Sequence, residues 1–157
     1  VQLAYHGLRA ADATFNVKLE TTFDPAVGQL EVVPQDLSRA VLNIVNNACY
    51  AAFAARSARG AGFTPAVSVR TRAEEGWIAI IVRDNGMGVP AALREKIFTP
   101  FFTTKPSGKG TGLGLSISYD IVVHAHHGEL VLDTVEGEYS QFTLRLPRAQ
   151  PAPGAPA

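Results

Sequence analysis

The sequence contains a single cysteine, Cys49, and no hydrophobic run long enough to cross a bilayer. One cysteine excludes an internal disulfide framework and is consistent with a reducing cytosol. The apolar run at residues 77–82 is far shorter than the ~20 residues that a membrane-spanning helix needs. The N-terminal residues show neither the apolar core nor the cleavage pattern of a secretory signal. We therefore expect a cytoplasmic chain without direct membrane contact.

The chain also lacks net charge, because 14 basic residues balance 14 acidic ones. No overall field attracts it to nucleic acid or to an anionic membrane, and we expect no nucleic-acid partner. With 157 residues, 46% of them hydrophobic, the chain is long enough to bury the core of one globular domain.

Hydrophobic periodicity predicts an α/β fold. We expect a two-layer sandwich in which a mixed sheet of roughly five strands packs on about three helices. The expected strands are residues 15–20, 30–33, 66–73, 77–83, 129–135 and 141–146, and the expected helices are residues 34–55, 91–98 and 112–127. Residues 1–11 are expected to end a preceding helix, residues 12–147 to form the domain, and the Pro/Ala-rich residues 148–157 to be disordered.

A glycine-rich stretch, GKGTGLGLSIS at residues 108–118, has the composition of a phosphate-binding loop. It fits neither the Walker spacing nor the dinucleotide fingerprint, and the chain has neither H-R-D nor D-F-G of the protein kinases. A G-x-G-x-G pattern at the start of a helix remains, where small residues let backbone N–H groups approach an anion. A purely structural helix entry is the alternative.

A second candidate is the sequence DNGMG at residues 84–88, which follows an apolar strand. The carboxylate of Asp84 is placed to accept a hydrogen bond from the amino group of adenine. An ordinary turn is the alternative, since D-x-G is common at turns.

The third candidate is the pair Asn43 and Asn47, which lie four residues apart and therefore on one face of the expected helix. Mg²⁺ takes few protein ligands and prefers oxygen, so one asparagine is a suitable ligand. Two asparagines that simply face solvent are the alternative.

Taken in order, these elements resemble the ATP-binding domain of histidine kinases. LNIVNNA (42–48), RDNGMGVP (83–90), IFTPFFTTK (97–105) and GKGTGLGLSIS (108–118) look like the N, G1, F and G2 boxes of that family. The resemblance covers roughly residues 12–147. It implies a Bergerat-type ATP fold, which gyrases, heat-shock chaperones and mismatch-repair ATPases share, and it implies ATP and Mg²⁺ as ligands.

The resemblance also implies roles for individual residues. Asp84 would read adenine with Gly86 and Gly88 beside the base, Asn47 would bind Mg²⁺, and Asn43 would lie near the phosphates. Residues 99–111 would form an ATP lid, called the lid segment below, which Phe101 and Phe102 anchor and whose Lys105 contacts the γ-phosphate. Tyr50 replaces a basic phosphate contact of the family, which leaves that work to Lys105 and Lys109. The implied nucleotide-binding set is Asn43, Asn47, Tyr50, Asp84, Gly86, Gly88, Phe102, Lys105, Lys109, Gly110, Thr111, Gly112, Leu113 and Gly114, with Asn43 and Lys105 also catalytic.

Asn43 helps to choose a function within the superfamily. ATP-hydrolysing relatives typically carry a glutamate there, and an asparagine cannot act as a general base. We therefore expect the domain to keep the γ-phosphate for an external nucleophile rather than for water. The alternatives are an ATP-hydrolysing clamp, a serine kinase of the anti-sigma type, and a nucleotide-sensing module without transfer. Gln141 stands where relatives often have a threonine near the adenine.

No histidine of the chain is a convincing phosphoacceptor. His6 lies in HGLRAA, but a strand is expected about ten residues later, which leaves no room for the two-helix hairpin that carries the acceptor in the family. The expected partners are therefore the dimerisation and phosphoacceptor domain of a parent kinase, which could be membrane-anchored, and a response regulator. We expect the isolated domain to be monomeric. The spacing of His124, His126 and His127 does not indicate a zinc site.

Overall fold

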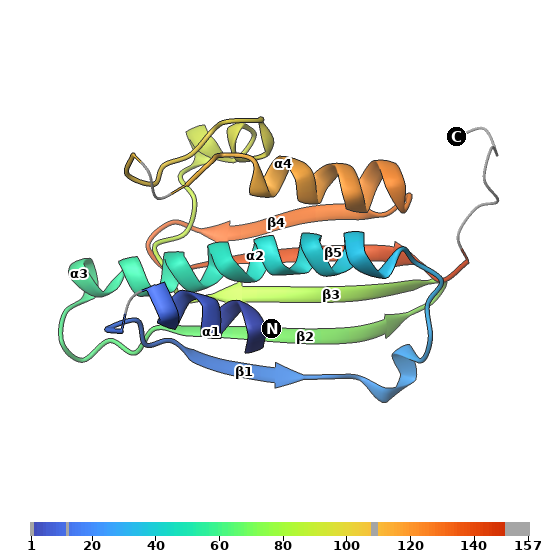
Figure 1. Cartoon of the computed structure of the whole chain (residues 1–157), viewed down its shortest axis with the longest axis horizontal. Coiled ribbons are helices and arrows are strands. Elements are labelled where there is room, and N and C mark those ends of the chain that lie inside the picture. Colours follow the sequence, from blue (N-terminus) through green and yellow to red (C-terminus); the bar gives the residue numbers. More distant parts are fainter. Residues whose placement is uncertain (1, 12, 108–109, 150–157) are drawn as a thin grey trace.

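A computed structural model describes residues 2–11, 13–107 and 110–149 and shows helices packed on one face of a five-stranded sheet (Figure 1). The helices are α1 (Gln2–Ala11), α2 (Pro34–Ala54), α3 (Arg56–Arg59) and α4 (Gly114–Tyr119). The strands are β1 (Lys18–Thr22), β2 (Ala66–Glu74), β3 (Trp77–Asp84), β4 (Glu129–Val135) and β5 (Tyr139–Pro147). Short helical turns lie at η1 (Pro25–Val27), η2 (Ala91–Leu93), η3 (Lys96–Phe98) and η4 (Asp120–Ala125).

The strand order is β1-β2-β3-β5-β4, with β1 parallel to β2 and the other neighbours antiparallel. The sheet is therefore mixed, and the predicted fold class is confirmed. Both predicted hairpins, β2–β3 and β4–β5, form next to each other through the pairing of β3 with β5. The N-terminal helix is present, whereas the expected disorder of the tail concerns residues that lie largely outside the described part of the chain.

Helix α2 lies along the sheet and contributes much of the core. It begins at Pro34, whose missing N–H costs nothing in the first turn. One face of the helix is buried against the sheet and carries Ala40, Ile44, Val45, Ala48, Cys49 and Ala52. The alternating residues Ser140, Phe142, Leu144 and Leu146 of β5 form the opposite wall. Asn43, Asn46 and Asn47 of α2 are partly exposed and do not belong to this buried face.

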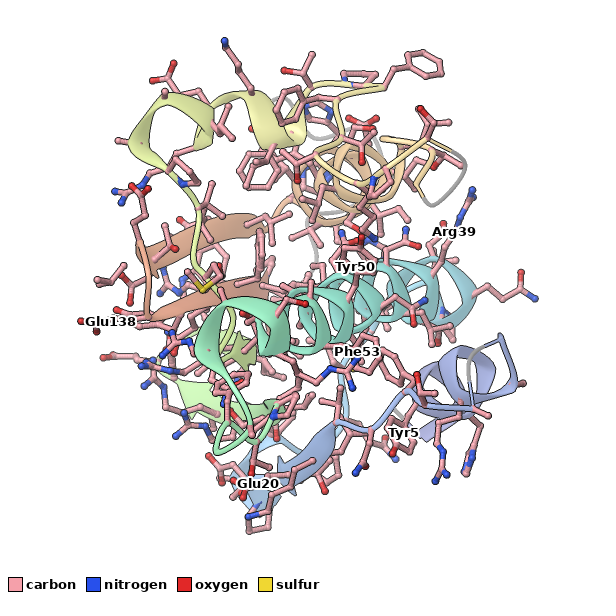
Figure 2. The ribbon with its side chains drawn as sticks, turned by 90° about the vertical axis from the view of Figure 1, so that its left-hand side faces the viewer. Tyr5, Glu20, Arg39, Tyr50, Phe53 and Glu138 are labelled. Atoms are coloured by element: carbon pink, nitrogen blue, oxygen red, sulfur yellow. The ribbon has the colours of Figure 1, made fainter. Side chains whose placement is uncertain are left out.

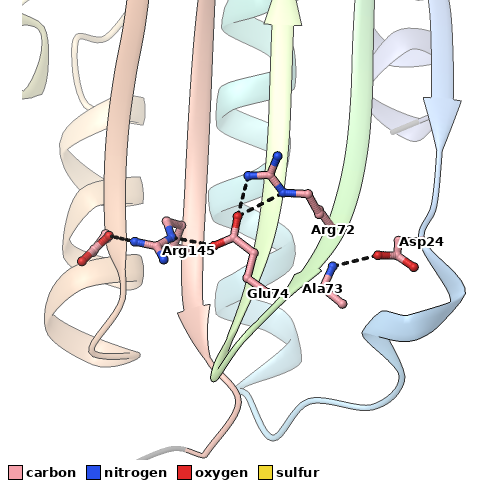
Figure 3. A network of polar contacts seen from close by, with 6 residues as sticks. Asp24, Arg72, Ala73, Glu74 and Arg145 are labelled. Atoms are coloured by element: carbon pink, nitrogen blue, oxygen red, sulfur yellow. Dashed lines mark hydrogen bonds and ion pairs between the residues drawn. The ribbon is translucent and has the colours of Figure 1, made fainter.

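The other face of the sheet carries a chain of ion pairs near the turn between β2 and β3, at the opposite end of β3 from Asp84 (Figure 3). The carboxylate of Glu74 accepts hydrogen bonds from Arg72 and, at 3.0 Å, from Arg145, which also donates to Glu129 at 2.6 Å. Asp24 accepts a 2.9 Å bond from the backbone N–H of Ala73. Partly exposed ion pairs of this kind contribute little stability.

Two predictions on strands need correction. Residues 30–33 form no strand, because the backbone N–H of Val33 donates to Nε2 of His126 at 3.1 Å instead of to a neighbouring strand. The first strand lies at Lys18–Thr22 rather than at residues 15–20, since pairing begins where Lys18 meets Ala66. The alternation that suggested an earlier start reflects buried Phe15 and Val17, which fill the core before the strand begins.

The predicted helices near the lid segment also differ in detail. Residues 91–98 form the two short turns η2 and η3 rather than one helix. The helix expected from residue 112 begins at Gly114 and widens into the π-helical η4 before His126.

His126 has a structural role. It is 2% exposed and is held on both ring nitrogens, with Nδ1 2.8 Å from the carbonyl of Ile121. The described residues hold no group of three His, Cys, Asp or Glu side chains suited to a metal ion. Within them there is also no helix of the length and hydrophobicity that crossing a membrane requires.

Candidate functional site

A cavity of about 590 Å³ lies between α2, the end of β3 and the lid segment. Most of the residues singled out from the sequence meet there. The cavity is lined by Asn43, Asn47, Tyr50, Asp84, Gly88, Phe102, Lys105, Gly110, Thr111, Gly112 and Gly114. Gly86 and Leu113 do not line it, and Lys109 lies outside the described residues.

Asp84 is the last residue of β3 and is 2% exposed. Its Oδ1 accepts a 2.9 Å hydrogen bond from the backbone N–H of Gly86, and the backbone of Ser140 also bonds to the carboxylate. Burial raises the pKa of Asp84 to about 6, although these bonds oppose the shift. The carboxylate is therefore a pre-positioned acceptor at a strand end, in a wall that excludes most water.

The glycines after Asp84 are required by close packing. A Cβ on Gly86 would lie 2.7 Å from Oδ1 of Asp84 and 2.9 Å from the backbone of Ala51. Gly88 has a φ of +69°, and a Cβ there would lie 2.3 Å from the carbonyl oxygen of Val135. Gly86 therefore packs directly against the carboxylate of Asp84, to which its N–H donates, whereas Gly88 lies in the cavity wall.

The polar face of α2 forms the opposite wall. Nδ2 of Asn43 donates to the carbonyl of Gly114 at 3.2 Å, which ties α2 to the start of α4. Figure 2 shows Tyr50 on the side of α2 near the lid segment, while Phe53 points toward α1. The side chain of Lys105 enters from the lid segment and donates a 3.0 Å hydrogen bond to Oδ1 of Asn47.

The ammonium of Lys105 also lies 4.5 Å from the centre of the Tyr50 ring, within the range of a cation–π interaction. Burial lowers the pKa of Lys105. Oδ1 of Asn47 thus already accepts from a cation, and an uncharged amide oxygen of this kind is a suitable ligand for Mg²⁺. The donor set fits a magnesium ion that keeps its other positions for water and phosphate oxygens.

The lid segment has no helix or strand among its described residues. It is followed directly by Gly112, whose φ is +70° and where a Cβ would lie 2.4 Å from the backbone of Phe101. Phe102 lines the cavity, but the prediction that Phe101 anchors the segment is wrong, because its side chain is 75% exposed. Phe98 packs inside instead, with ring centres 5.8 Å from Tyr119 and 6.3 Å from Phe142.

Leu113 acts through its backbone rather than in the cavity wall. It precedes α4, and its carbonyl accepts from the backbone N–H of Ile117 at 2.9 Å and from the hydroxyl of Ser116 at 3.0 Å. Thr111 receives the N–H of Leu113 on its hydroxyl at 3.3 Å and lines the cavity.

Sequence reasoning missed several wall residues. Ser140, not Gln141, faces the cavity, because Ser140 is the cross-strand partner of Asp84 and Gln141 pairs with Arg83.

The helix α2 also supplies wall residues that the sequence did not single out. Asn46 lines the cavity, and its Oδ1 is buried without a hydrogen-bond partner in the described part of the chain. Ala51 and Ala54 could have been found from the sequence, since they continue the helical spacing of Asn47 and Tyr50.

A family model described as "Histidine kinase-, DNA gyrase B-, and HSP90-like ATPase" matches residues 32–150. The match covers more than half of the chain and includes every cavity residue named above. The chain belongs to this ATPase family. The resemblance inferred from the four sequence motifs is therefore confirmed, and membership supports ATP as the substrate of the domain.

The curated relatives to which this chain is similar include sensor kinases. The sensor histidine kinase ZraS of Escherichia coli O157:H7 is 32% identical over 148 residues, which cover 92% of this chain and 30% of that protein. The signal transduction histidine-protein kinase AtoS of Escherichia coli K12 is 38% identical over 87% of this chain and 20% of its own length. The two-component sensor PprA of Pseudomonas aeruginosa is 51% identical over half of this chain. This chain spans less than a third of the length of each relative.

Solved structures of histidine kinases share the fold of this ATPase domain. The catalytic domain of histidine kinase ThkA superposes with a TM-score of 0.74 at 25% identity, covering 94% of this chain and 89% of that one. Full-length ShkA in complex with AMPPNP superposes with a TM-score of 0.75 over 96% of this chain and 30% of that one, at 20% identity.

Proposed function

We propose that this chain binds Mg-ATP in the cavity and donates the γ-phosphoryl group to a histidine on a dimerisation domain of its parent kinase. The observation that carries the proposal is the convergence of Asp84, Asn47 and Lys105 on one cavity from three segments far apart in the sequence. A buried carboxylate suits a base, an amide oxygen suits a metal, and an ammonium suits a phosphate.

The adenine would lie at the Asp84 end of the cavity. Its amino group donates to the carboxylate, an interaction that discriminates against bases without an amino group at that position. Ser140 lies beside Asp84 with a hydroxyl that can add a polar contact, while Ala51 and Ala54 offer an apolar wall for the ring.

The phosphates would lie at the other end, between α2 and the lid segment. Asn47 would hold Mg²⁺, which neutralises phosphate charge when bound. Lys105 would transfer its hydrogen bond from Asn47 to a γ-phosphate oxygen, because its ammonium already reaches across from the lid segment to α2. Gly110, Gly112 and Gly114 let the backbone approach the phosphates without side-chain obstruction.

The chemistry of the transfer requires little from the domain beyond position and charge. The acceptor imidazole nitrogen forms a bond to the γ-phosphorus while the bond to the β–γ bridging oxygen breaks, and ADP leaves. Asn43 cannot deprotonate a water molecule, and its amide is occupied by the carbonyl of Gly114. The site therefore favours transfer over hydrolysis.

In this proposal the acceptor histidine lies on a separate domain, and the phosphoryl group then passes to an aspartate of a response regulator. The reaction takes place in the cytoplasm, where ATP is available. His6 is exposed on α1 and is not among the residues that line the cavity.

Radiolabel transfer in trans tests the proposal. The chain is incubated with [γ-³²P]ATP, Mg²⁺ and the dimerisation domain of the parent kinase, with that domain's acceptor histidine replaced by glutamine as the control. We expect label on the unaltered domain only. Label on serine, or steady release of inorganic phosphate without a labelled protein, would instead support a serine kinase or a hydrolysing clamp.

A further inference from the structure

Arg59 is the last residue of α3. It contacts the loop that follows Asp84 in the sequence, although Arg59 does not line the cavity. The short helix α3 follows α2 directly, where Ala54 and Ala55 form part of the cavity wall. Its guanidinium lies 5.2 Å from the centre of the Phe63 ring, which limits its orientation.

The Nη2 group of Arg59 joins two loops that are distant in the sequence. It lies 3.2 Å from the carbonyl oxygen of Gly86 and 3.3 Å from that of Glu138, and it also donates to the carbonyl of Gly137. The first oxygen belongs to the loop after β3, and the other two belong to the turn between β4 and β5. A charged donor shared between carbonyls fixes both loops relative to α3.

The two loops also contact each other through their backbones. The N–H of Gly137 donates to the carbonyl of Met87 at 2.7 Å. Next to this contact, the side-chain hydroxyl of Thr134, in β4, accepts from the backbone N–H of Val89 at 2.9 Å. Gly88 approaches Val135 so closely that no side chain fits between them. Arg59 therefore completes a contact that the glycines make possible.

The peptide groups around Gly86 connect Arg59 to the carboxylate of Asp84. The N–H of Gly86 donates to Oδ1 of Asp84 at 2.9 Å, and the carbonyl of Gly86 accepts from Arg59. Gly86 is also packed against Ala51 of α2. Movement of this loop would change both the hydrogen bond that orients the carboxylate and its distance from the α2 wall.

We propose that Arg59 is a positioning residue for adenine recognition, which clamps the Gly86 loop to the β4–β5 turn and so orients the Asp84 carboxylate toward the base. The inference rests on the proposed function, because it assigns the Asp84 end of the cavity to adenine. Nothing in this role requires Arg59 to touch the nucleotide.

The test compares Arg59→Ala with Arg56→Ala, which removes another exposed arginine of the same helix. Arg56 lies 3.5 Å from the centre of the Phe53 ring and donates to the carbonyl of Phe53, with no bond to either loop. Calorimetry on the full chain measures the affinities for ATP, ADP and inosine triphosphate. The base of inosine triphosphate lacks the amino group. The thermal unfolding of each variant is also measured without nucleotide.

We expect Arg59→Ala to lower the affinities for ATP and for ADP by the same factor, about tenfold for the loss of a charged hydrogen-bond donor. The affinity for inosine triphosphate should fall less, so the preference for ATP over inosine triphosphate should decrease. A general loss of stability would leave this preference unchanged. Arg56→Ala should keep both affinity and preference. Arg59→Lys retains one charged donor and should give an intermediate preference, and it replaces the alanine variant if that variant does not fold.

Equal nucleotide preference in the unaltered chain and in both Arg59 variants would overturn the clamp while leaving ATP binding intact. A loss of preference in Arg56→Ala equal to that in Arg59→Ala would also overturn it. Failure of the unaltered chain to bind ATP would instead overturn the proposed function, and the clamp with it.

Discussion

Nζ of Lys105 donates a 3.0 Å hydrogen bond to Oδ1 of Asn47, so a cation from the lid segment already reaches the amide that we assign to Mg²⁺. The two residues are 58 positions apart in the sequence and come from an irregular segment and a helix. Their contact shows that the lid segment can deliver positive charge to the wall of the cavity, where the proposed phosphates lie.

Replacing Lys105 should therefore impair transfer more than binding. We predict that Lys105→Ala lowers the rate of histidine phosphorylation at saturating ATP by about 100-fold, the typical cost of losing one donor to the transition state. ADP affinity should change much less, because ADP lacks the γ-phosphate.

The matched control is Lys96→Ala, which removes an exposed lysine of η3 that does not line the cavity. Transfer rates and ADP affinities of both variants are measured side by side. A Lys105→Ala variant that transfers phosphate at the unaltered rate would show that Lys105 does not contact the γ-phosphate.

Adenine recognition should depend on pH through Asp84, whose pKa burial raises to about 6. An ionised carboxylate is the better acceptor, so the preference for ADP over inosine diphosphate should fall by about tenfold as pH drops from 7.5 to 5. Using the ratio of two diphosphates cancels the titration of the phosphates themselves. A ratio that stays constant over this range would contradict the assignment of Asp84 to the base.

Protonation of Asp84, which should weaken adenine binding, should at the same time increase the stability of the folded domain. Because the folded pKa exceeds the ordinary value of 3.8, the native state binds the proton more tightly than the unfolded state. The stabilising contribution of this group to the free energy of unfolding is fully present below about pH 4 and is lost as pH rises through about 6. Once the carboxylate is charged, the loss amounts to about 3 kcal/mol. The empty domain should therefore gain stability from this group at the pH values where adenine binding weakens.

The two glycines that follow the lid segment, Gly112 and Gly114, should differ in their tolerance of a side chain. Gly112 has a φ of +70° and no room for a Cβ, whereas a Cβ on Gly114 would lie 3.7 Å from Asn43 in ordinary contact. We predict that Gly112→Ala costs at least about 2 kcal/mol and lowers Tm by roughly 4–8 °C. Gly114→Ala should leave Tm nearly unchanged in the same unfolding experiment, and an equal loss in both variants would show that backbone conformation at Gly112 is not the cause.

The local patterns of the sequence were sufficient to predict α2, the two hairpins and several polar residues of the cavity, among them Asn43, Asn47 and Asp84. The spacing of Asn43 and Asn47 places both side chains on the same face of α2, and this follows from local helix geometry alone. Ser140 could not be assigned to the cavity, because its role depends on the register between β3 and β5, which are far apart in the sequence. A shift of one residue exchanges the two faces of a strand, and it is why Gln141 was the wrong choice.

The predicted strand at residues 30–33 failed for a related reason. Its apolar residues are real, since Leu30 and Val32 pack against the core, but burial alone does not supply a neighbouring strand. The partner of Val33 is His126, 93 positions away, and no local pattern indicates that contact. Likewise, Arg59 has no motif of its own, and only the approach of the β4–β5 turn shows what it joins.

The most direct test of the account is calorimetric titration of ATP into the unaltered chain and into Asp84→Asn, each with Mg²⁺ and with a chelator. We predict one site in the unaltered chain, tighter binding when Mg²⁺ is present, and no measurable binding by a folded Asp84→Asn variant. Equal affinity of the two proteins, or no binding by the unaltered chain at millimolar ATP, would contradict the claim that this cavity holds the nucleotide.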